Sequence, residues 1–515
     1  MISILLTYSN FQIFGKTSMR KTYDSQLKFG QIDIADIMID LNDRDELPQL
    51  LIGLKAIKMN TDVRDAIFKI LLESFGKQAD LNNGRPGMDI WKILVLGVVR
   101  LICNWDFDKL RNIVNNHLTL RLMLGHLKDD WSDYPLQTLK DNISKFTPDV
   151  LDKINQVIVN YGHTVFKKSD IPLKLNASAD SFVVETNVHF PTDISLLWDA
   201  NRCAVISSMK LGRDLGLSDW RQGAHQLRKL KQSLRDVSNL KHSTSKDESV
   251  KQKKQIQIQE AYQVSLDIAI DQVNNIRATL DSIKELDTLT QLRIDAIKEY
   301  LVHSDRQIDQ IRRRAIQDEK IPHNEKVFSI FEPHTEWISK GKAGVPVELG
   351  VKVCIVKDQN GLILHHRIME NETDNQIAVD IITETKKNFP ALSTCSFDKG
   401  FHSPDNQTKL AAILDRVVLP RKGKLSTETA AIEKGPEFVQ LRRKHSAVES
   451  AINALENHGL DRCPDHGIAG FKRYVGLAVL ARNIQIIGRA IQVKKLQELE
   501  KAEKRKKPCR LTACG

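Results

Sequence analysis

Three acidic residues are the groups in this sequence best suited to chemistry. Asp398 directly follows the apolar run Leu392–Phe397 and precedes a Lys-Gly pair, which predicts a buried strand that leaves its sheet at the acid. Asp180 stands at the end of the alternating run that begins at Leu173, and the strand-like pattern continues into Phe182-Val183-Val184. Glu449 lies in a stretch expected to be helical. Because an Asp near Gly is also common turn chemistry, the Asp398 pattern gains weight only from the other two acids.

Three carboxylates that converge without His or Cys form a set of hard oxygen ligands. Such a set suits Mg²⁺, with Mn²⁺ as an alternative. Two such ions can activate an attacking hydroxyl and stabilise the leaving oxygen of an in-line phosphoryl displacement. Without cations, the three acids would repel both one another and a DNA backbone. We therefore predict that Asp180, Asp398 and Glu449 are catalytic metal ligands.

The third acid has an alternative in Glu456, which shares a helical face with Glu449. Both acids fall in a helix predicted from about Pro436 to His458. Glu449 is preferred because His445 and Arg442 stand four and seven residues before it and bring cationic groups suited to a phosphate. Solvated charges on a helix face are the structural alternative for both acids.

The elements that must position these acids indicate an α/β fold. A strand with Asp180 is followed by a hairpin around Asn360-Gly361, a helix, the strand with Asp398, a helix, a strand and the helix with Glu449. This is the element order of a ribonuclease H-like domain, predicted here over residues 166–490. Adjacent parallel strands would bring the two aspartates together across the long intervening sequence.

A long helical insertion interrupts that domain at residues 217–321. Neither Gly nor Pro occurs between Ala224 and Ile321, and apolar residues recur at spacings close to the coiled-coil period. Residues 239–250 are polar and predict the tip of a hairpin. A structural spacer or an oligomerisation arm is the favoured interpretation.

The N-terminal part predicts an all-α domain over residues 61–165, after an uncertain segment at 1–60. Short helices with basic residues on their outer faces fit a DNA-binding unit of the helix-turn-helix type and fit a solvated bundle equally well. At the other end, residues 491–515 form a basic tail.

Composition bounds the class of partner. Lys and Arg exceed Asp and Glu by 76 to 65, which gives a formal charge of +11 and makes an anionic polymer a reasonable partner. The aromatic share of 6% argues against base stacking on single strands as the main binding mode. Seven scattered cysteines without zinc spacing suggest a reduced intracellular protein, and no stretch reaches membrane-spanning length.

Several stretches together resemble the bacterial insertion-sequence DDE transposases, and the ISNCY group most of all. The resemblance covers roughly residues 80–490. The stretches are GRPGMDIWKILVLGVVRLICNWDFDKLRNIVNNHLTLRLMLGH, VVETNVHFPTD after Asp180, SIFEPHTEWISKGKAGVPVELGVKV, SFDKGF, HSAVESAINALENHGLDRC and GFKRYVGLAVLARNI.

This resemblance implies that Asp180, Asp398 and Glu449 are the DDE triad. It implies a transposase that uses Mg²⁺ to cut double-stranded DNA at the terminal inverted repeats of its element and joins the 3′-OH ends to target DNA. It further implies a homodimer or larger synaptic complex in the bacterial cytoplasm, at the nucleoid. The chain departs from related transposases at two positions, where His445 and Glu456 replace a usual Arg and Lys.

Basic side chains near the acids and in the insertion are candidate contacts to the DNA backbone, although each fits a solvated charge as well. They are Lys399, Arg442, Arg443, His445, Arg312 and Arg313. Two alternative functions remain: a related nuclease without strand transfer, and a catalytically inactive DNA-binding protein derived from a transposase.

Overall fold

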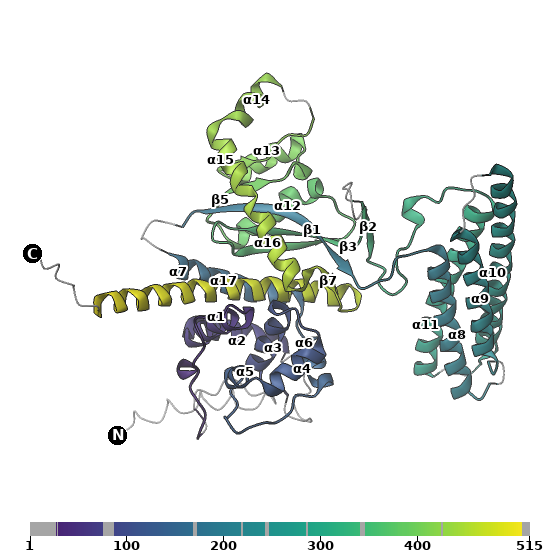
Figure 1. Ribbon diagram of the computed structural model, residues 1–515, viewed down its shortest axis with the longest axis horizontal. Coiled ribbons are helices and arrows are strands. Elements are labelled where there is room, and N and C mark those ends of the chain that lie inside the picture. The colour runs from purple at the N-terminus through teal and green to yellow at the C-terminus, as the bar shows by residue number, and fades with distance from the viewer. Residues whose placement is uncertain are drawn as a thin grey trace, which may run out of the picture. The chain divides into compact units, whose positions relative to one another are not determined.

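The computed structural model describes residues 27, 29–75, 87–167, 173–217, 220–242, 247–284, 287–339, 346–423 and 426–506. The chain divides into two compact units (Figure 1). Residues 1–187 and 350–515 form the first unit, and residues 188–349 form the second. The fold is mixed α/β and rich in helix, with a sheet of both parallel and antiparallel strands. The domain boundaries given by the sequence stay a prediction.

The first unit begins with a series of helices, and several start at a side-chain cap that the sequence provides. Asp89, Asp106 and Thr147 each accept a hydrogen bond from a backbone N–H in the first turn of the helix that follows. The helices are α1 (Glu46–Met59), α2 (Thr61–Phe75), α3 (Ile90–Ile102), α4 (Phe107–Asn116), α5 (Leu118–Met123), α6 (Leu136–Ile143) and α7 (Pro148–Phe166).

The sheet of this unit has the strand order β4-β3-β1-β5-β6, and β7 pairs with the far end of β1. β3 lies antiparallel to both β1 and β4, whereas β5 lies parallel to both β1 and β6. Gly361 takes a φ of +89° in the predicted hairpin between β3 and β4. The strands are β1 (Leu175–Thr186), β3 (Val347–Lys357), β4 (Ile363–Met369), β5 (Leu392–Phe397), β6 (Arg416–Val418) and β7 (Arg462–Cys463).

The helix predicted over residues 436–458 is present as two consecutive helices. One ends at His445, and the other starts at Ala447 and runs into a π-helical turn at Glu456–Leu460, while Ser446 between them keeps right-handed helical φ and ψ (−55° and −20°). Ser446 separates the two helices, and its hydroxyl donates to the Arg443 carbonyl (2.8 Å), an example of a side chain that competes with the helical ladder. The remaining helices of the unit are α12 (Asp374–Asn388), α13 (Pro404–Ile413), α14 (Thr427–Lys434), α15 (Pro436–His445), α16 (Ala447–Leu455) and α17 (Gly467–Lys506).

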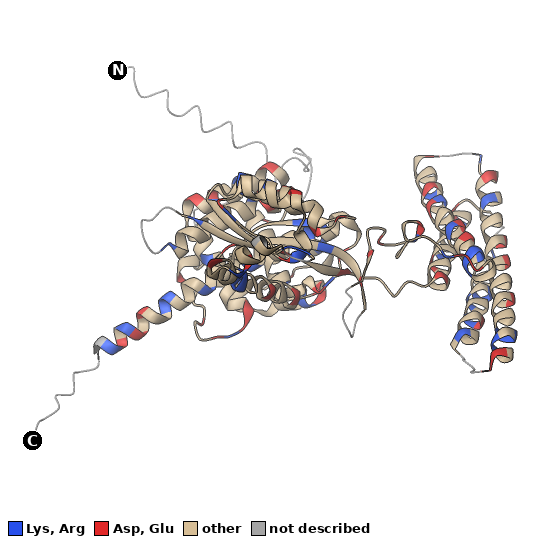
Figure 2. Cartoon of the chain, turned by 90° about the horizontal axis from the view of Figure 1, so that it is seen from above, with Lys and Arg blue, Asp and Glu red and all other residues tan. Residues whose placement is uncertain are grey.

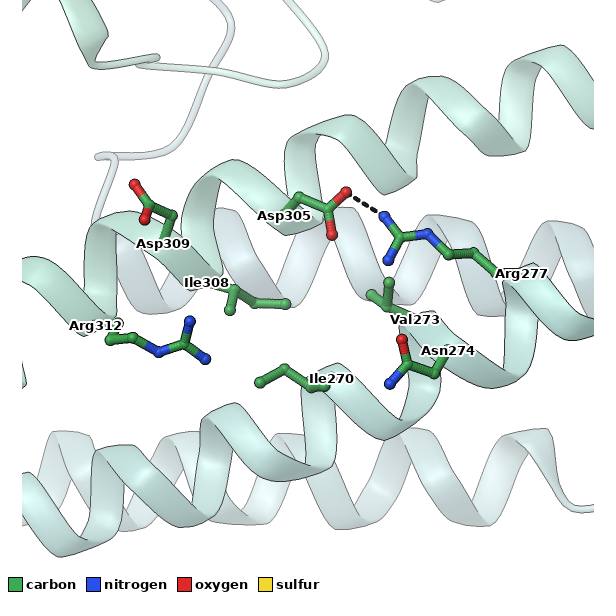
Figure 3. A pocket seen from close by; sticks show the side chains of 8 residues that line it. All are labelled: Ile270, Val273, Asn274, Arg277, Asp305, Ile308, Asp309 and Arg312. Carbon is green, nitrogen blue, oxygen red and sulfur yellow. Dashed lines mark hydrogen bonds and ion pairs between the residues drawn. The ribbon is translucent and has the colours of Figure 1, made fainter.

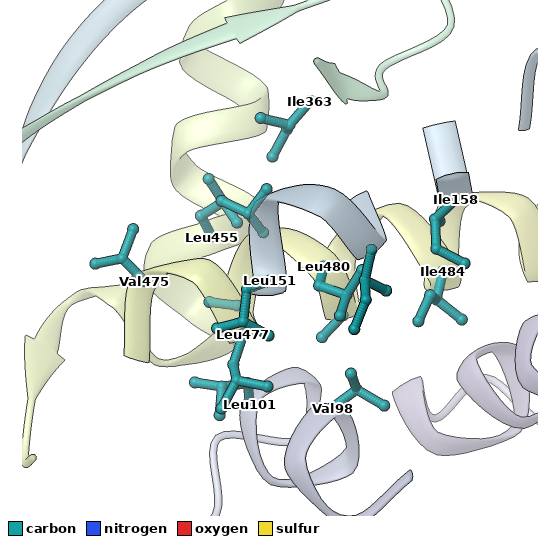
Figure 4. Close-up of a cluster of buried hydrophobic side chains, with 14 of the residues drawn as sticks. Val98, Leu101, Leu151, Ile158, Ile363, Leu455, Val475, Leu477, Leu480 and Ile484 are labelled. Atoms are coloured by element: carbon teal, nitrogen blue, oxygen red, sulfur yellow. The ribbon is translucent and has the colours of Figure 1, made fainter. Parts of the chain in front are cut away.

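The core of the first unit is organised around α17, which is yellow in Figure 1. This helix packs against α1, α3 and α7 and also contacts β4, so it lies between the N-terminal helices and the sheet. Figure 4 shows Leu477 and Ile484 of α17 among Val98 of α3, Ile158 of α7 and Ile363 of β4. A single hydrophobic cluster therefore joins the helices to the sheet.

The second unit contains a bundle of four helices with its own apolar core. Arg293 pairs with Asp214 (2.7 Å) and Arg314 pairs with Asp193, which fixes α8 antiparallel to α11 at both ends. The sequence places the insertion at 217–321, and α8 precedes that range within the same unit. The elements are α8 (Asp193–Asp214), α9 (Gly223–His242), α10 (Glu248–Ser282), α11 (Thr288–Ile311) and β2 (Glu336–Ser339).

Parts of several predicted segments fall outside the described residues. Among them are most of residues 1–28, residues 76–86 of the predicted helical domain, the loop at 243–246 inside the predicted hairpin tip, residues 340–345, and the end of the basic tail at 507–515. Within the described part of the chain, no helix combines the length and apolar character needed to cross a membrane.

The crossing of α1 and α17 generates a stability prediction. A Cβ added at Gly488 would overlap the Gln49 carbonyl oxygen, so we expect Gly488→Ala to lower the free energy of unfolding by ~1–3 kcal/mol. Gly470→Ala on the same helix is the control, because its nearest neighbour would be Asp465 Cβ at 3.4 Å, an ordinary contact. Thermal denaturation followed by circular dichroism compares the two variants. Equal midpoints would contradict the close crossing.

Candidate active site

Parallel pairing of β1 with β5 brings the first two acids to neighbouring strands. Ala179 is paired with Phe397, so the next residue on each strand is one of the two aspartates. β5 ends at Phe397 and Asp398 begins the exposed turn that follows, as predicted. β1 does not end at Asp180 but continues to Thr186 through its antiparallel pairing with β3, as the strand-like pattern at residues 182–184 predicted. Asp180 therefore lies in mid-strand, where its parallel neighbour ends.

Glu449, the predicted third acid, is carried by α16, which packs against β1. Val448, Ile452 and Leu455 are buried and fix the inner face of this helix, whereas Glu449 is exposed. Glu449 contributes to the electrostatic field at Asp180. The alternative acid, Glu456, lies two turns further along, where the helix becomes a π-helical turn. This arrangement favours Glu449 as the third acid.

The surroundings of Asp180 raise the pKa of its carboxyl group. Burial raises its pKa most, and the negative charges of Asp398, Asp374 and Glu449 raise it further, to about 6. A hydrogen bond that Asp180 accepts from the Ser181 N–H (2.8 Å) partly opposes this shift. The ionised carboxylate is therefore destabilised in the folded protein, and a bound cation would relieve that cost.

Asp374 is a fourth carboxylate at this site that the sequence reasoning missed. Its Oδ1 accepts a hydrogen bond from Ser181 Oγ (2.6 Å), and its Oδ2 lies 3.6 Å from Lys352 Nζ. The same carboxylate packs beside Gly400, in the turn after Asp398. Asp374 begins the predicted helix α12, and the capping box at Thr373 was the available signal for an acid fixed at this position.

His445 belongs to a polar chain beside the acids. Its Nδ1 lies 3.1 Å from Ser396 Oγ, which donates to Ser178 Oγ (2.9 Å). Burial lowers the pKa of His445, while Asp398 and Glu449 act in the opposite direction. The net lowering favours a neutral imidazole near neutral pH, which weakens the expectation that His445 supplies a positive charge to a phosphate.

The carboxylates of the site differ from a preformed metal centre in their spacing. Among the described residues, no group of three or more His, Cys, Asp or Glu side chains stands close enough to hold a metal ion. The chemistry of the set nevertheless fits, because it offers carboxylate oxygens and carries an excess of negative charge at Asp180. Ion binding would require these side chains to rotate towards one another.

The predicted DNA-contacting residues differ in their availability. Lys399, Arg442 and Arg443 are exposed on the first unit, on the turn after β5 and on α15. Arg313 in the second unit is bound by Asp309 (3.2 Å), Glu319 (2.6 Å) and Glu325 (2.7 Å), so its charge is already compensated.

Arg312 lines a groove of about 280 Å³ between α10 and α11, together with Ile270, Ile308 and the ion pair of Arg277 with Asp305 (Figure 3). The floor of this groove is apolar, and its walls carry charges of both signs. Mixed charge of this kind also covers the outer helices of the second unit (Figure 2), so nothing distinguishes Arg312 as a phosphate contact.

Comparison with known proteins supports a transposase. The family described as Transposase DDE domain matches residues 309–484, which include Asp398 and Glu449. Asp180 lies before the matched segment and is joined to it by the β1–β5 pairing. No curated protein and no solved structure matches the chain. The match supports a DDE transposase family and, with it, a nuclease and transferase that acts on DNA.

The raised pKa of Asp180 predicts a pH-dependent gain in stability for Asp180→Asn. Because the folded state binds the Asp180 proton more tightly, wild-type stability falls as pH rises from about 4 to about 6. Without divalent cations, the variant should be more stable than wild type by ~3 kcal/mol at pH 8 and equally stable at pH 4. Chemical denaturation in EDTA measures the difference.

Asp129→Asn, which removes an exposed acid on the loop between α5 and α6, is the control and should show no such pH dependence. If Asp180→Asn gained no stability at pH 8, the picture of a buried carboxylate among like charges would fail.

Proposed function

We propose that this protein is a DNA transposase of the ISNCY-like group. It cuts DNA at the terminal inverted repeats of its own insertion sequence and joins the freed 3′-OH ends to target DNA. Asp180, Asp398 and Glu449 are its catalytic residues and bind Mg²⁺, or Mn²⁺ in its place. The family match to residues 309–484 and the grouping of these acids support the proposal.

The catalytic domain is proposed to be ribonuclease H-like. The order β4-β3-β1-β5-β6, with β3 antiparallel and β5 parallel to β1, supports this assignment. The second unit is then an insertion between the first two strands of that sheet. The N-terminal helices are a separate all-α region, proposed to bind DNA.

The observation that carries the proposal is the neighbouring position of Asp180 and Asp398. More than two hundred residues separate them, and yet β1 and β5 pair in a register that aligns the two acids. Core packing explains neither acid, since Asp398 is exposed and Asp180 is destabilised by its neighbours. A destabilised carboxylate beside a second acid on the neighbouring strand is typical of functional sites.

A bound divalent cation would supply the positive charge that activates the attacking hydroxyl and stabilises the leaving oxygen. The chain's own groups prepare the site for this chemistry. Asp180, Asp398 and Glu449 present carboxylate oxygens, and the hydrogen bond from Ser181 to Asp374 fixes the backbone beside the first of them. His445, held by Ser396, borders the same acids.

Exposed cations beside the acids are proposed to hold the DNA backbone. Lys399 follows Asp398 directly, and Arg442 and Arg443 stand on α15, which packs against β5. Contacts of this type attract phosphates without reading the base sequence and make binding dependent on salt. Arg312 and Arg313 are left out of this proposal, because three carboxylates compensate Arg313 and charges of both signs surround Arg312. The active form is proposed to be a homodimer or larger synaptic complex, located in the bacterial cytoplasm at the nucleoid.

Replacing the acids singly tests the function. The substrate is a supercoiled plasmid that carries the reading frame with its flanking DNA on both sides, incubated with purified protein and Mg²⁺. We expect Asp398→Asn to lower the cleavage rate by about 10³-fold, since the metal contributes several kcal/mol to the barrier. Gel separation of cut from joined products distinguishes a transposase from a nuclease that only hydrolyses. Equal cleavage by wild type and Asp398→Asn would refute the triad.

Glu449→Gln and Glu456→Gln form a matched pair for the third acid. We expect the first to lose cleavage as completely as Asp398→Asn and the second to retain it, because Glu449 acts on Asp180. The reverse result would assign the role to Glu456. A wild-type protein that binds its flanking DNA with Mg²⁺ present and cuts nothing would favour the alternative of an inactive, transposase-derived DNA-binding protein.

A further inference from the structure

A polar hollow of about 470 Å³ lies on the N-terminal helical region of the first unit. One wall is a face of α4, where Arg111, Asn112 and Asn115 follow one another at helical spacing. The other wall is the loop before α6, with Trp131 and Asp133. This volume falls within the range of small-molecule sites, which is about 300–1,000 Å³.

Trp131 is exposed over 55% of its surface, and yet the loop that carries it is firmly braced. The buried guanidinium of Arg121 donates to the carbonyls of Asp130 and Ser132, on either side of the tryptophan. His126 bonds to Asp130 Oδ2 (2.6 Å) and to the Tyr134 hydroxyl (2.6 Å). These contacts hold the loop, so the indole ring is presented in a fixed position instead of being packed inside.

The amide groups of the facing helix are also oriented in advance. Asn116 Nδ2 donates to the carbonyl (2.8 Å) and to the side-chain Oδ1 (2.9 Å) of Asn112. Asn115 Oδ1 accepts a hydrogen bond from the Tyr134 N–H (2.9 Å), which ties α4 to the loop. The hollow therefore combines one aromatic face with several fixed hydrogen-bonding groups, the composition of a recognition site for a flat polar molecule.

The charges of the hollow exclude a phosphate as its main ligand. Its lining has two carboxylates, Asp108 and Asp133, against the one guanidinium of Arg111. A nucleobase fits better, because Asn side chains pair with adenine edges, carboxylates accept from cytosine amino groups, and a tryptophan stacks on any base. A base inside a duplex cannot offer its face to the ring, so the ligand must be an unpaired nucleotide.

We propose that the hollow between α4 and the Trp131 loop binds one unpaired nucleobase of a DNA strand. The inference rests on the proposed function only for the choice of DNA as the source of the base. A site that stacks one base on one tryptophan agrees with the low aromatic content of the chain. That low content does not support stacking of successive bases along an extended single strand. The hollow is distinct from the candidate active site, which is built on β1, β5 and α16.

Binding of short single-stranded DNA to the full-length protein tests the proposal. A fluorescently labelled oligonucleotide and its blunt duplex are titrated in EDTA, and fluorescence anisotropy gives both affinities over a range of salt concentrations. We expect Trp131→Ala to weaken binding of the single strand about tenfold and to leave duplex binding unchanged. Trp131→Phe, which retains an aromatic ring, should recover part of the loss. Because Trp131 is uncharged, the salt dependence of binding should not change.

Arg111→Ala and Lys109→Ala form a matched pair, since each removes one exposed cation from α4 and only Arg111 lines the hollow. Both variants should reduce the salt dependence of DNA affinity by a similar amount. Only Arg111→Ala should weaken the single strand more than the duplex.

Four results would overturn the proposal. The first is that the wild type does not bind single-stranded DNA, and the second is that Trp131→Ala does not weaken that binding. The third is that Trp131→Ala weakens binding of the single strand and the duplex equally. The fourth is that Trp131→Ala changes self-association, measured by light scattering, which would assign the hollow to a second copy. Unfolding curves of the variants exclude misfolding as the cause of a loss. Binding is measured in EDTA and needs no cleavage, so failure of the catalytic proposal and failure of this one give different results.

Discussion

Pairing of β1 with β5 is the interaction on which the rest of the structure depends. A parallel pair cannot be closed by a tight turn, so the chain between the two strands must form other structure before it returns. Here it forms the second unit and the hairpin of β3 and β4. The pairing aligns Asp180 with Asp398. The stability of the sheet therefore holds the Asp180 carboxylate in a position where its ionised form is unfavourable.

A single core makes the first unit rigid around this pairing. α17 packs on α1, α3 and α7 and reaches β4, so the N-terminal helices and the sheet share their apolar contacts. The small side chain of Gly488 permits the close approach of α17 to α1. Since the hollow beside Trp131 and the acids lie in the same unit, a nucleotide bound at one would be held at a defined position relative to the other.

Local sequence patterns predicted most of the strands and helices, because periodicity and capping residues act over a few positions. The strand before Asp398 and the helix at Asp374 followed from such patterns. The break at Ser446 did not, since a serine hydroxyl competes with the helical ladder only in some contexts. The approach of Asp374 depends on tertiary packing with Ser181, so it could not be predicted locally.

The basic composition overstates the charge available to DNA. Arg121 is buried and binds backbone carbonyls, Arg100 pairs with Asp465 (2.8 Å) beneath the surface, and Arg313 is compensated by three carboxylates. Such cations contribute to the formal charge of +11 and yet stabilise the fold itself. Affinity for a phosphate backbone must come from exposed cations without such partners, such as Lys399, which directly follows Asp398, and Arg442 and Arg443 on α15. The positions of the cations therefore determine the affinity of this protein for DNA more than its net charge does. A paired or buried cation releases no counterions from DNA and so adds nothing to that affinity.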